Sequence, residues 1–123
     1  MGGNRIRGDD ELLRRLAPKN SFKRDRRTPT RGAFKTGAEY DRQISVQVRR
    51  LLPNPHDPLT VLGSERRDWG LGSLRAKDVI DLGFSVEMDP KEGDPAHALI
   101  LGETTQVLAD ELVECMKIIK YPD

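Results

Sequence analysis

The chain has 123 residues and one cysteine, with 36% hydrophobic and 33% charged residues and a formal net charge of +1. This length suits one domain with one modest core, and a single cysteine excludes an internal disulfide framework and a multi-cysteine zinc site. No apolar run approaches the roughly 18 residues that span a bilayer, and the N-terminus lacks the apolar stretch of a signal peptide. We therefore expect a cytoplasmic protein that does not contact a membrane.

The small net charge conceals an asymmetry between two parts of the chain. Residues 1–50 contain 14 Lys and Arg against 6 Asp and Glu, a balance of +8, whereas residues 51–123 contain 7 against 14, a balance of −7. Parts of opposite charge attract each other, within one fold or between neighbouring copies, so the pattern allows a homo-oligomer. The alternative is that the basic part forms a surface for phosphate groups.

We expect the N-terminal segment, residues 1–31, to stand apart from a folded domain at residues 32–121. It contains a predicted short helix, because the acidic run at 9–11 precedes Leu12-Leu13-Arg14-Arg15-Leu16 and Pro18 follows. Acids near the start of a helix and arginines near its end favour the helix dipole, and a proline ends the helix.

Residues 19–31 are the strongest indication of a partner. Their cations are interrupted by Pro29, and this composition predicts an exposed and flexible loop. Arginines can neutralise phosphates and an aromatic ring can stack on a base, which makes nucleic acid a candidate partner. Against this, the pI of about 7.9 is below the value of roughly 9 typical of a dedicated nucleic-acid-binding domain. The candidate binding residues of this stretch are Phe22, Arg24, Arg26, Arg27 and Arg31.

Three segments are predicted to be strands, residues 43–49, 84–88 and 96–101, because apolar residues alternate with polar ones or form a short bounded run. The last two are joined by a connector too short for a crossover, so they are expected to pair antiparallel. Amphipathic helices are predicted at 74–82 and 104–119, the second capped by a threonine. Together these elements indicate an α+β fold: a small, mainly antiparallel sheet with helices packed on one face.

The connection between the first two predicted strands is expected to be irregular. Three prolines force a loop at 52–58, and a single helical turn is predicted at 59–62. Residues 64–68 are charged and expected to be exposed. Residues 69–73 contain two glycines and fit either a strand or a tight backbone passage.

His97 is the leading candidate for chemistry because it lies in an otherwise apolar strand, next to a loop with Asp89, Glu92 and Asp94. A histidine oriented by a carboxylate can act as a general base or form half of a phosphate or nucleotide site. The alternative, which the alternation along 96–99 favours, is a surface or hydrogen-bonded structural histidine. Asp94 and His97 are included among the candidate binding residues.

The other residues that carry chemistry form no convergent set. Two histidines and one cysteine at distant positions match no metal-ligand spacing, so we predict neither a metal nor a cofactor. Cys115 lies on the predicted apolar stripe of the last helix, where a free cysteine is usually a small buried hydrophobe. Gly70-Leu71-Gly72 lacks the third glycine and the Lys-Ser/Thr pair of a phosphate loop.

Four short motifs spread over most of the chain are similar to those of a group of small bacterial proteins without an assigned activity. This resemblance implies a prokaryotic origin and a shared surface formed by residues 94–98 and the region of Phe34. It implies no activity. The motifs are Arg14-Arg15-Leu16-Ala17-Pro18, Arg31-Gly32-Ala33-Phe34, Ile44-Ser45-Val46 and Asp94-Pro95-Ala96-His97-Ala98.

Three functions are compatible with these features. The first, favoured by the lack of a convergent catalytic set, is a non-enzymatic binding module for a protein partner in a prokaryotic assembly, which it contacts through the basic stretch and the 89–97 loop. The second is an enzyme acting on a nucleotide or NAD-like ligand, in which Arg14, Arg15 or Arg31 holds phosphate and His97 transfers a proton. The third is a nucleic-acid accessory protein that binds through the basic stretch.

Overall fold

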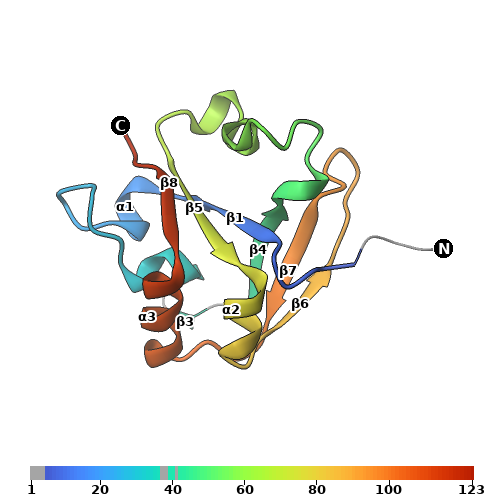
Figure 1. Cartoon of the computed structure of the whole chain (residues 1–123). Helices are drawn as coiled ribbons and strands as arrows, with labels where there is room; N and C mark the ends of the chain where they lie inside the picture. Colours follow the sequence, from blue (N-terminus) through green and yellow to red (C-terminus); the bar gives the residue numbers. More distant parts are fainter. Residues whose placement is uncertain (1–4, 37–38, 41) are drawn as a thin grey trace.

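The computed structural model describes residues 5–36, 39–40 and 42–123. Its main feature is a six-stranded antiparallel sheet in the order β6-β7-β4-β1-β5-β8, beside which β2 and β3 form a separate two-stranded pair (Figure 1). The strands are β1 (Glu11–Leu16), β2 (Lys35–Thr36), β3 (Glu39–Tyr40), β4 (Gln43–Val48), β5 (Gly70–Arg75), β6 (Ser85–Met88), β7 (His97–Leu101) and β8 (Lys117–Lys120). The helices are α1 (Pro18–Ser21), α2 (Ala76–Asp81) and α3 (Gln106–Cys115), with 3-10 helices η1 (Arg31–Phe34), η2 (Arg49–Leu51), η3 (Pro58–Leu62) and η4 (Ser64–Arg66).

The three strands predicted from alternation are confirmed as β4, β6 and β7. Strands β6 and β7 form the expected antiparallel hairpin, and β7 pairs with β4 on its other side, where Gln47 lies opposite His97. Residues 69–73, which fit either a strand or a tight backbone passage, include most of strand β5. Its neighbour α2 confirms the helix predicted at 74–82.

The helix predicted before Pro18 is wrong, because that segment is strand β1 in the middle of the sheet. Leu12 and Leu13 face opposite sides of the sheet and both are fully buried. Asp10 does not serve a helix dipole, because its carboxylate accepts hydrogen bonds from Arg50 at 2.8 and 3.0 Å. Burial raises the pKa of Asp10, but the hydrogen bonds from Arg50 and from the Arg7 backbone N–H outweigh it, so the pKa lies below its usual value.

The N-terminal segment therefore supplies part of the domain's core. Leu12, Leu16 and Phe22 belong to the same buried cluster as residues of β4, β5 and α3. A domain boundary after residue 31 would separate β1 from both of its neighbours in the sheet, β4 and β5. Residues 1–4 of this segment lie outside the described part of the chain.

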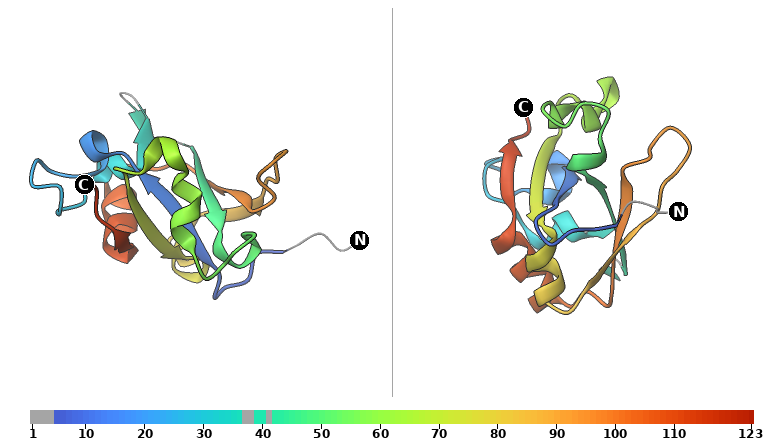
Figure 2. Two further views of the ribbon diagram at one scale, coloured as in Figure 1. Left: turned by 90° about the horizontal axis from the view of Figure 1, so that it is seen from above. Right: turned by 45° about the vertical axis from the view of Figure 1, so that its right-hand side comes forward.

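Two buried clusters lie on the two faces of the sheet. Helices α2 and α3 cover one face through side chains such as Val79 and Leu112, which confirms the expectation of helices packed on one face. The other face is covered by the segment from η2 to η4, whose Val61 and Leu62 pack with Leu13. In Figure 1 the two helices lie below the strands and this segment lies above them, and Figure 2 shows the same arrangement from two further directions.

The last predicted helix is shorter than expected. Its cap is confirmed, since the Thr105 side chain accepts a hydrogen bond from the Leu108 backbone N–H at 3.2 Å. The continuation of this helix to Ile119 is wrong, because Met116 has an extended backbone and the next residues form β8, an edge strand paired with β5. Within the residues that the structure describes, no helix has the length and apolar character needed to cross a membrane.

Candidate functional site

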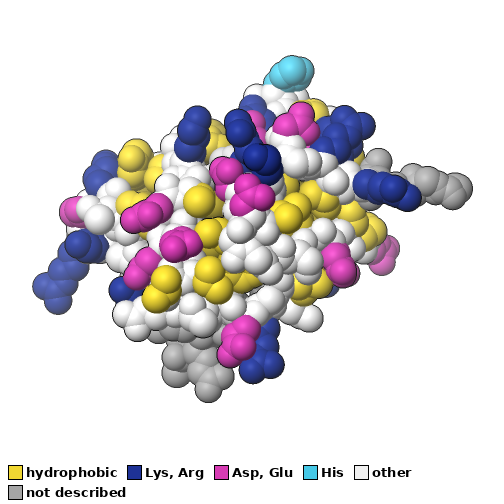
Figure 3. Space-filling view, turned by 60° about the horizontal axis from the view of Figure 1, so that its bottom comes forward, with side chains coloured by type: hydrophobic (Ala, Val, Ile, Leu, Met, Phe, Trp, Pro, Cys, Tyr) yellow, Lys and Arg dark blue, Asp and Glu magenta, His cyan; other side chains and the backbone are white. Residues whose placement is uncertain are grey.

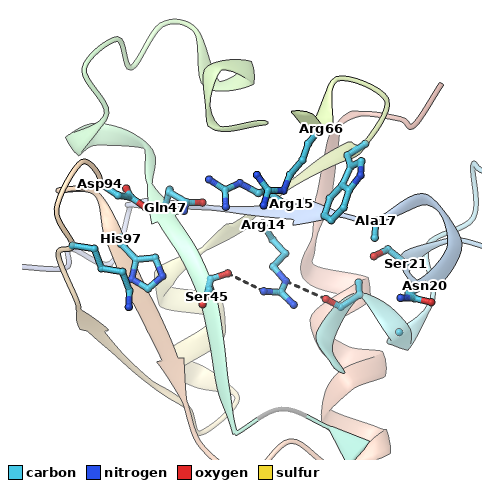
Figure 4. Close-up of a pocket in the computed structure, with 14 residues that line it drawn as sticks. Arg14, Arg15, Ala17, Asn20, Ser21, Ser45, Gln47, Arg66, Asp94 and His97 are labelled. Atoms are coloured by element: carbon cyan, nitrogen blue, oxygen red, sulfur yellow. Dashed lines mark hydrogen bonds between the residues drawn. The ribbon is translucent and has the colours of Figure 1, made fainter. Parts of the chain in front are cut away.

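A pocket of about 490 Å³ opens where strands β1 and β4 separate, and we call it the β1–β4 pocket. The register of the two strands ends at the pair Leu13–Gln47, after which β1 continues beside β5 and β4 continues beside β7. Arg14 bridges the gap, because its Nε donates to the Ala33 carbonyl at 3.1 Å and its Nη1 donates to the Ser45 carbonyl at 2.9 Å (Figure 4). The gap is thus lined by side chains from both strands.

Positive charge dominates the β1–β4 pocket. Among the described residues that line it, four carry a cationic side chain and one carries a carboxylate. They come from β1, from η4 and from the loop between β6 and β7, so three distant parts of the sequence converge here. These residues are Arg14, Arg15, Arg66 and Lys91, with Asp94 as the acid.

Arg15 and Arg66 form a pair of like charges in this pocket, and Figure 4 shows their side chains side by side. Arg15 Nε donates to the Val61 carbonyl at 2.7 Å, and the Arg66 guanidinium lies 5.4 Å from the centre of the Trp69 ring. Burial and then the charge of Arg66 lower the pKa of Arg15, while Asp94 acts in the opposite direction. No carboxylate of the described residues forms an ion pair with either arginine. The pair therefore presents an excess of positive charge to a ligand.

His97 lines the same pocket and is 6% exposed, so it does not lie on the surface. Its Nδ1 lies 2.9 Å from the Asp89 carbonyl oxygen and 3.2 Å from the Asp89 carboxylate. Both oxygens only accept hydrogen bonds, so Nδ1 carries the proton and Nε2 of the neutral ring is an acceptor. The carboxylate beside His97 is that of Asp89, whereas the Asp94 carboxylate accepts from Gln47 Nε2 at 3.2 Å.

The structure brings four of the sequence candidates together and separates others. Arg14, Arg15, Asp94 and His97 share the β1–β4 pocket. Arg31 lies outside it, and its Nε and Nη2 bind both carboxylate oxygens of an α3 residue at 2.9 and 3.0 Å, which ties η1 to α3. The α3 residue is Asp110.

Phe22 is 5% exposed and belongs to the core, so its ring is not presented for stacking on a base. It packs instead beside Tyr121, with ring centres 6.4 Å apart. The sequence places Phe22 among cations but gives no sign that the fold turns its ring inward.

Arg24, Arg26 and Arg27 lie on an exposed turn at residues 22–29 that is closed by its own hydrogen bonds. The Lys23 N–H donates to the Thr28 carbonyl at 2.9 Å. Arg26 donates to the carbonyl of the C-terminal residue, and the Arg27 guanidinium lies 5.3 Å from the centre of the Tyr121 ring. The turn is thus attached to the C-terminal residues.

The Asp25 carboxylate organises this turn. It accepts hydrogen bonds from the Thr28 hydroxyl at 2.6 Å and from the backbone N–H groups of Arg27 and Thr28 at 2.8 and 2.9 Å. The hydroxyl first, and then the two N–H groups, lower the pKa of Asp25 to about 2. The Asp25 carboxylate therefore stabilises the turn in which it lies.

Sequence reasoning missed several residues of the pocket. Arg66 lies in a stretch expected to be exposed, Trp69 in a segment that fits either a strand or a tight passage, and Gln47 is one of the polar residues that alternate along the predicted strand 43–49. Lys91 lies in the connector between the last two predicted strands. No local pattern in the sequence marks these residues as part of the site.

Metal and thiol chemistry have little support in the described part of the chain. There, no group of three or more His, Cys, Asp or Glu side chains is placed to hold a metal ion. Burial, and then the negative charges of Asp78, Glu111 and Glu114, raise the pKa of the Cys115 thiol. A thiol with a raised pKa is a weak nucleophile at neutral pH.

Comparison with known proteins adds no relative. The chain matches no family model, no curated protein and no solved structure. A function has therefore to be inferred from the β1–β4 pocket itself.

Proposed function

We propose that the protein binds a small phosphorylated ligand of the nucleotide type in the β1–β4 pocket. The observation that carries this proposal is the pair Arg15 and Arg66, two guanidinium groups that share the pocket without an ion-paired carboxylate among the described residues. Guanidinium groups bind phosphate oxygens through two parallel hydrogen bonds, and a phosphate between them would relieve their repulsion.

The other residues of the pocket suit the rest of such a ligand. A volume of about 490 Å³ lies in the range typical of small-molecule sites. Trp69 is partly exposed and the Arg66 guanidinium lies over its ring, so a base could stack on the guanidinium plane, while the amides of Asn20 and Gln47 offer donors and acceptors. His97 Nε2 adds an acceptor when the ring is neutral and a donor to phosphate when it is protonated.

The proposal is tested by calorimetric titration and thermal unfolding with AMP, ADP, NAD and inorganic phosphate, with adenosine as the uncharged comparison. We expect the phosphorylated compounds to raise the melting temperature and adenosine to have little effect, because a ligand that binds the folded state stabilises it. If neither the nucleotides nor phosphate bind, the proposal is wrong.

Arg66→Gln and Arg67→Gln form a matched pair of variants. Both residues lie at the end of η4, but only Arg66 is among the described residues that line the pocket. Loss of a charge-assisted hydrogen bond to phosphate should weaken nucleotide affinity about tenfold or more in Arg66→Gln and leave Arg67→Gln within about twofold of the unaltered chain. Equal affinities in the two variants would remove Arg66 from the site.

Two further expectations from the sequence are separate from this proposal. Docking of a protein partner stays a prediction, and so does proton transfer by His97. Co-purification from the native host tests the first of them. Turnover of a bound nucleotide, lost in a His97 variant that still binds, tests the second.

A further inference from the structure

We propose that the β1–β4 pocket is one end of a longer site for single-stranded nucleic acid, which continues past α1 onto a second basic pocket; this inference rests on the proposed function. The second pocket has a volume of about 260 Å³, and we call it the turn pocket. Four of the six described residues that line it are cationic, and none is acidic. They are Lys19, Lys23, Arg24 and Arg26, with Pro18 and Phe22.

The two pockets are neighbours because helix α1 lines both. Pro18 and Lys19 at its start line the turn pocket, while Asn20 and Ser21 at its end line the β1–β4 pocket. At about 100° per residue, Pro18 and Lys19 lie on the side of α1 opposite to Asn20 and Ser21, so a strand that occupies both pockets crosses the helix, which is about 10 Å wide. A strand of several nucleotides can span this distance. A mononucleotide in the β1–β4 pocket would leave the turn pocket empty.

The turn pocket presents cations that are not neutralised within the described residues. Lys19, Lys23 and Arg24 are exposed, and none of them forms an ion pair there. The nearby Asp25 carboxylate is held by Thr28 and by backbone N–H groups of the turn. A turn already fixed by such hydrogen bonds loses little conformational freedom when a ligand binds.

Aromatic rings distinguish a nucleic acid from an acidic peptide as the occupant. Trp69 lies in the β1–β4 pocket under Arg66, and Tyr121, 45% exposed, lies beside the turn under Arg27. Bases stack on aromatic rings and on guanidinium planes, whereas Asp and Glu side chains use neither ring face. The rings and the cations together fit a chain of alternating phosphates and bases.

The surface charge on the face of α2 and α3 is mixed. Figure 3 views the molecule from the side of α2 and α3, and there cationic and anionic side chains are interspersed with hydrophobic ones. Residues 1–50 have an excess of eight positive charges, and part of this excess lies in the two pockets, because the stretch from Arg14 to Arg26 supplies cations to both. The modest overall pI is compatible with binding by a localised basic track.

The test compares a fluorescein-labelled dodecathymidylate, followed by fluorescence anisotropy, with thymidine monophosphate, followed by calorimetry. We expect the oligonucleotide to bind about tenfold or more tightly than the mononucleotide, with a steep dependence on salt. A dodecauridylate probe in parallel distinguishes DNA from RNA as the natural strand. A poly-glutamate peptide of the same length serves as the acidic-peptide competitor.

Two triple variants test the turn pocket. Lys19→Gln/Lys23→Gln/Arg24→Gln removes its unpaired cations, and Arg75→Gln/Lys77→Gln/Lys117→Gln removes three exposed cations that line neither pocket. The first should weaken oligonucleotide binding about tenfold or more and lower the salt slope by about 2, since each phosphate contact on a single strand contributes roughly 0.7. It should leave mononucleotide affinity within about twofold. The second should leave both affinities nearly unchanged.

The outcomes separate this inference from the proposed function. If the mononucleotide binds but the oligonucleotide binds no more tightly, or if both triple variants behave alike, the extended site is wrong and the β1–β4 pocket stands. If the peptide displaces the oligonucleotide at equal concentration, the partner is an acidic protein segment. If neither nucleotide probe binds, the proposed function fails together with the inference.

Discussion

Leu13 of β1 and Gln47 of β4 form the last residue pair that joins these two strands in the centre of the sheet. Beyond this pair the Ser45 carbonyl finds a donor in the Arg14 guanidinium at 2.9 Å instead of a backbone N–H of β1. Backbone polar groups need partners, and an arginine that satisfies one allows two central strands to diverge. The divergence creates the β1–β4 pocket, so the site is a consequence of the strand arrangement.

The central position of β1 predicts that a fragment of residues 32–123 does not fold. Without β1, both β4 and β5 lose a neighbour, and the core loses Leu12, Leu13 and Leu16, all fully buried. We expect the fragment to lack a cooperative transition in urea followed by circular dichroism. A fragment of residues 5–123 is the control and should unfold cooperatively. Cooperative unfolding of the shorter fragment would contradict this prediction and would support a domain boundary after residue 31.

Gly32→Ala should destabilise the protein and disturb the pocket together. A Cβ at this position would overlap the carbonyl oxygen of Asn20, which is backbone and cannot rotate away. Forcing α1 and η1 apart should lower the free energy of unfolding by about 1–3 kcal/mol, the usual cost of overpacking. Urea denaturation measures it. Gly8→Ala is the control, since its Cβ would meet the nearest side-chain atom, Cβ of Lys77, at 3.7 Å; equal losses in both variants would contradict the clash.

His97→Ala and His97→Asn separate the structural and ligand roles of this histidine. Alanine leaves the buried side of the Asp89 carbonyl without its donor, which should cost about 1–3 kcal/mol. The asparagine amide can replace Nδ1–H, so His97→Asn should recover more than half of that loss in thermal unfolding. Neither variant has Nε2, so both should bind nucleotide more weakly. Equal stability of the two variants would show that the contact with Asp89 contributes little.

The turn at 22–29 should weaken in acid. The pKa of Asp25 is lowered from 3.8 to about 2 in the folded chain, so its carboxylate stabilises the fold fully above pH 3.8, and this contribution is lost as the pH falls towards 2. Thr28→Val removes the hydroxyl donor and should move the pKa back towards 3.8. Titration of the Asp25 carboxyl carbon by NMR measures both values. An unchanged titration in Thr28→Val would assign the shift to the backbone N–H groups.

Alternation in the sequence predicts the strands that have one wet face or a hairpin partner, and it misses those in other surroundings. Strand β1 is buried on both faces, so Leu12 and Leu13 are adjacent apolar residues without a period of two. Strand β8 was missed because Leu112, Met116 and Ile119 repeat at helical spacing although the helix ends at Cys115. Hydrophobic periodicity shows which side chains of an element share a face, but it does not show the order of the strands in the sheet.

The sequence indicates single residues of the candidate site, but it does not give the strand order that brings them together. Arg14, Arg15, Asp94 and His97 are conspicuous in the sequence, and their convergence depends on β1 and β7 lying on either side of β4. Arg66 reaches the pocket from a connection that covers the second face of the sheet, which no local pattern reveals. Phe22 and Arg31 are equally conspicuous, yet the fold uses them in its core and in an ion pair.

The order of strands also has a consequence for biosynthesis. Strand β1 leaves the ribosome before both of its partners, β4 and β5, which begin at Gln43 and Gly70. Its apolar residues therefore have no strand partner on the β5 side until Gly70–Arg75 has been made, and pairing over such sequence distances is slow. Newly made chains should thus depend on chaperones until β5 has been translated, and a pause in translation before Gly70 would prolong that dependence.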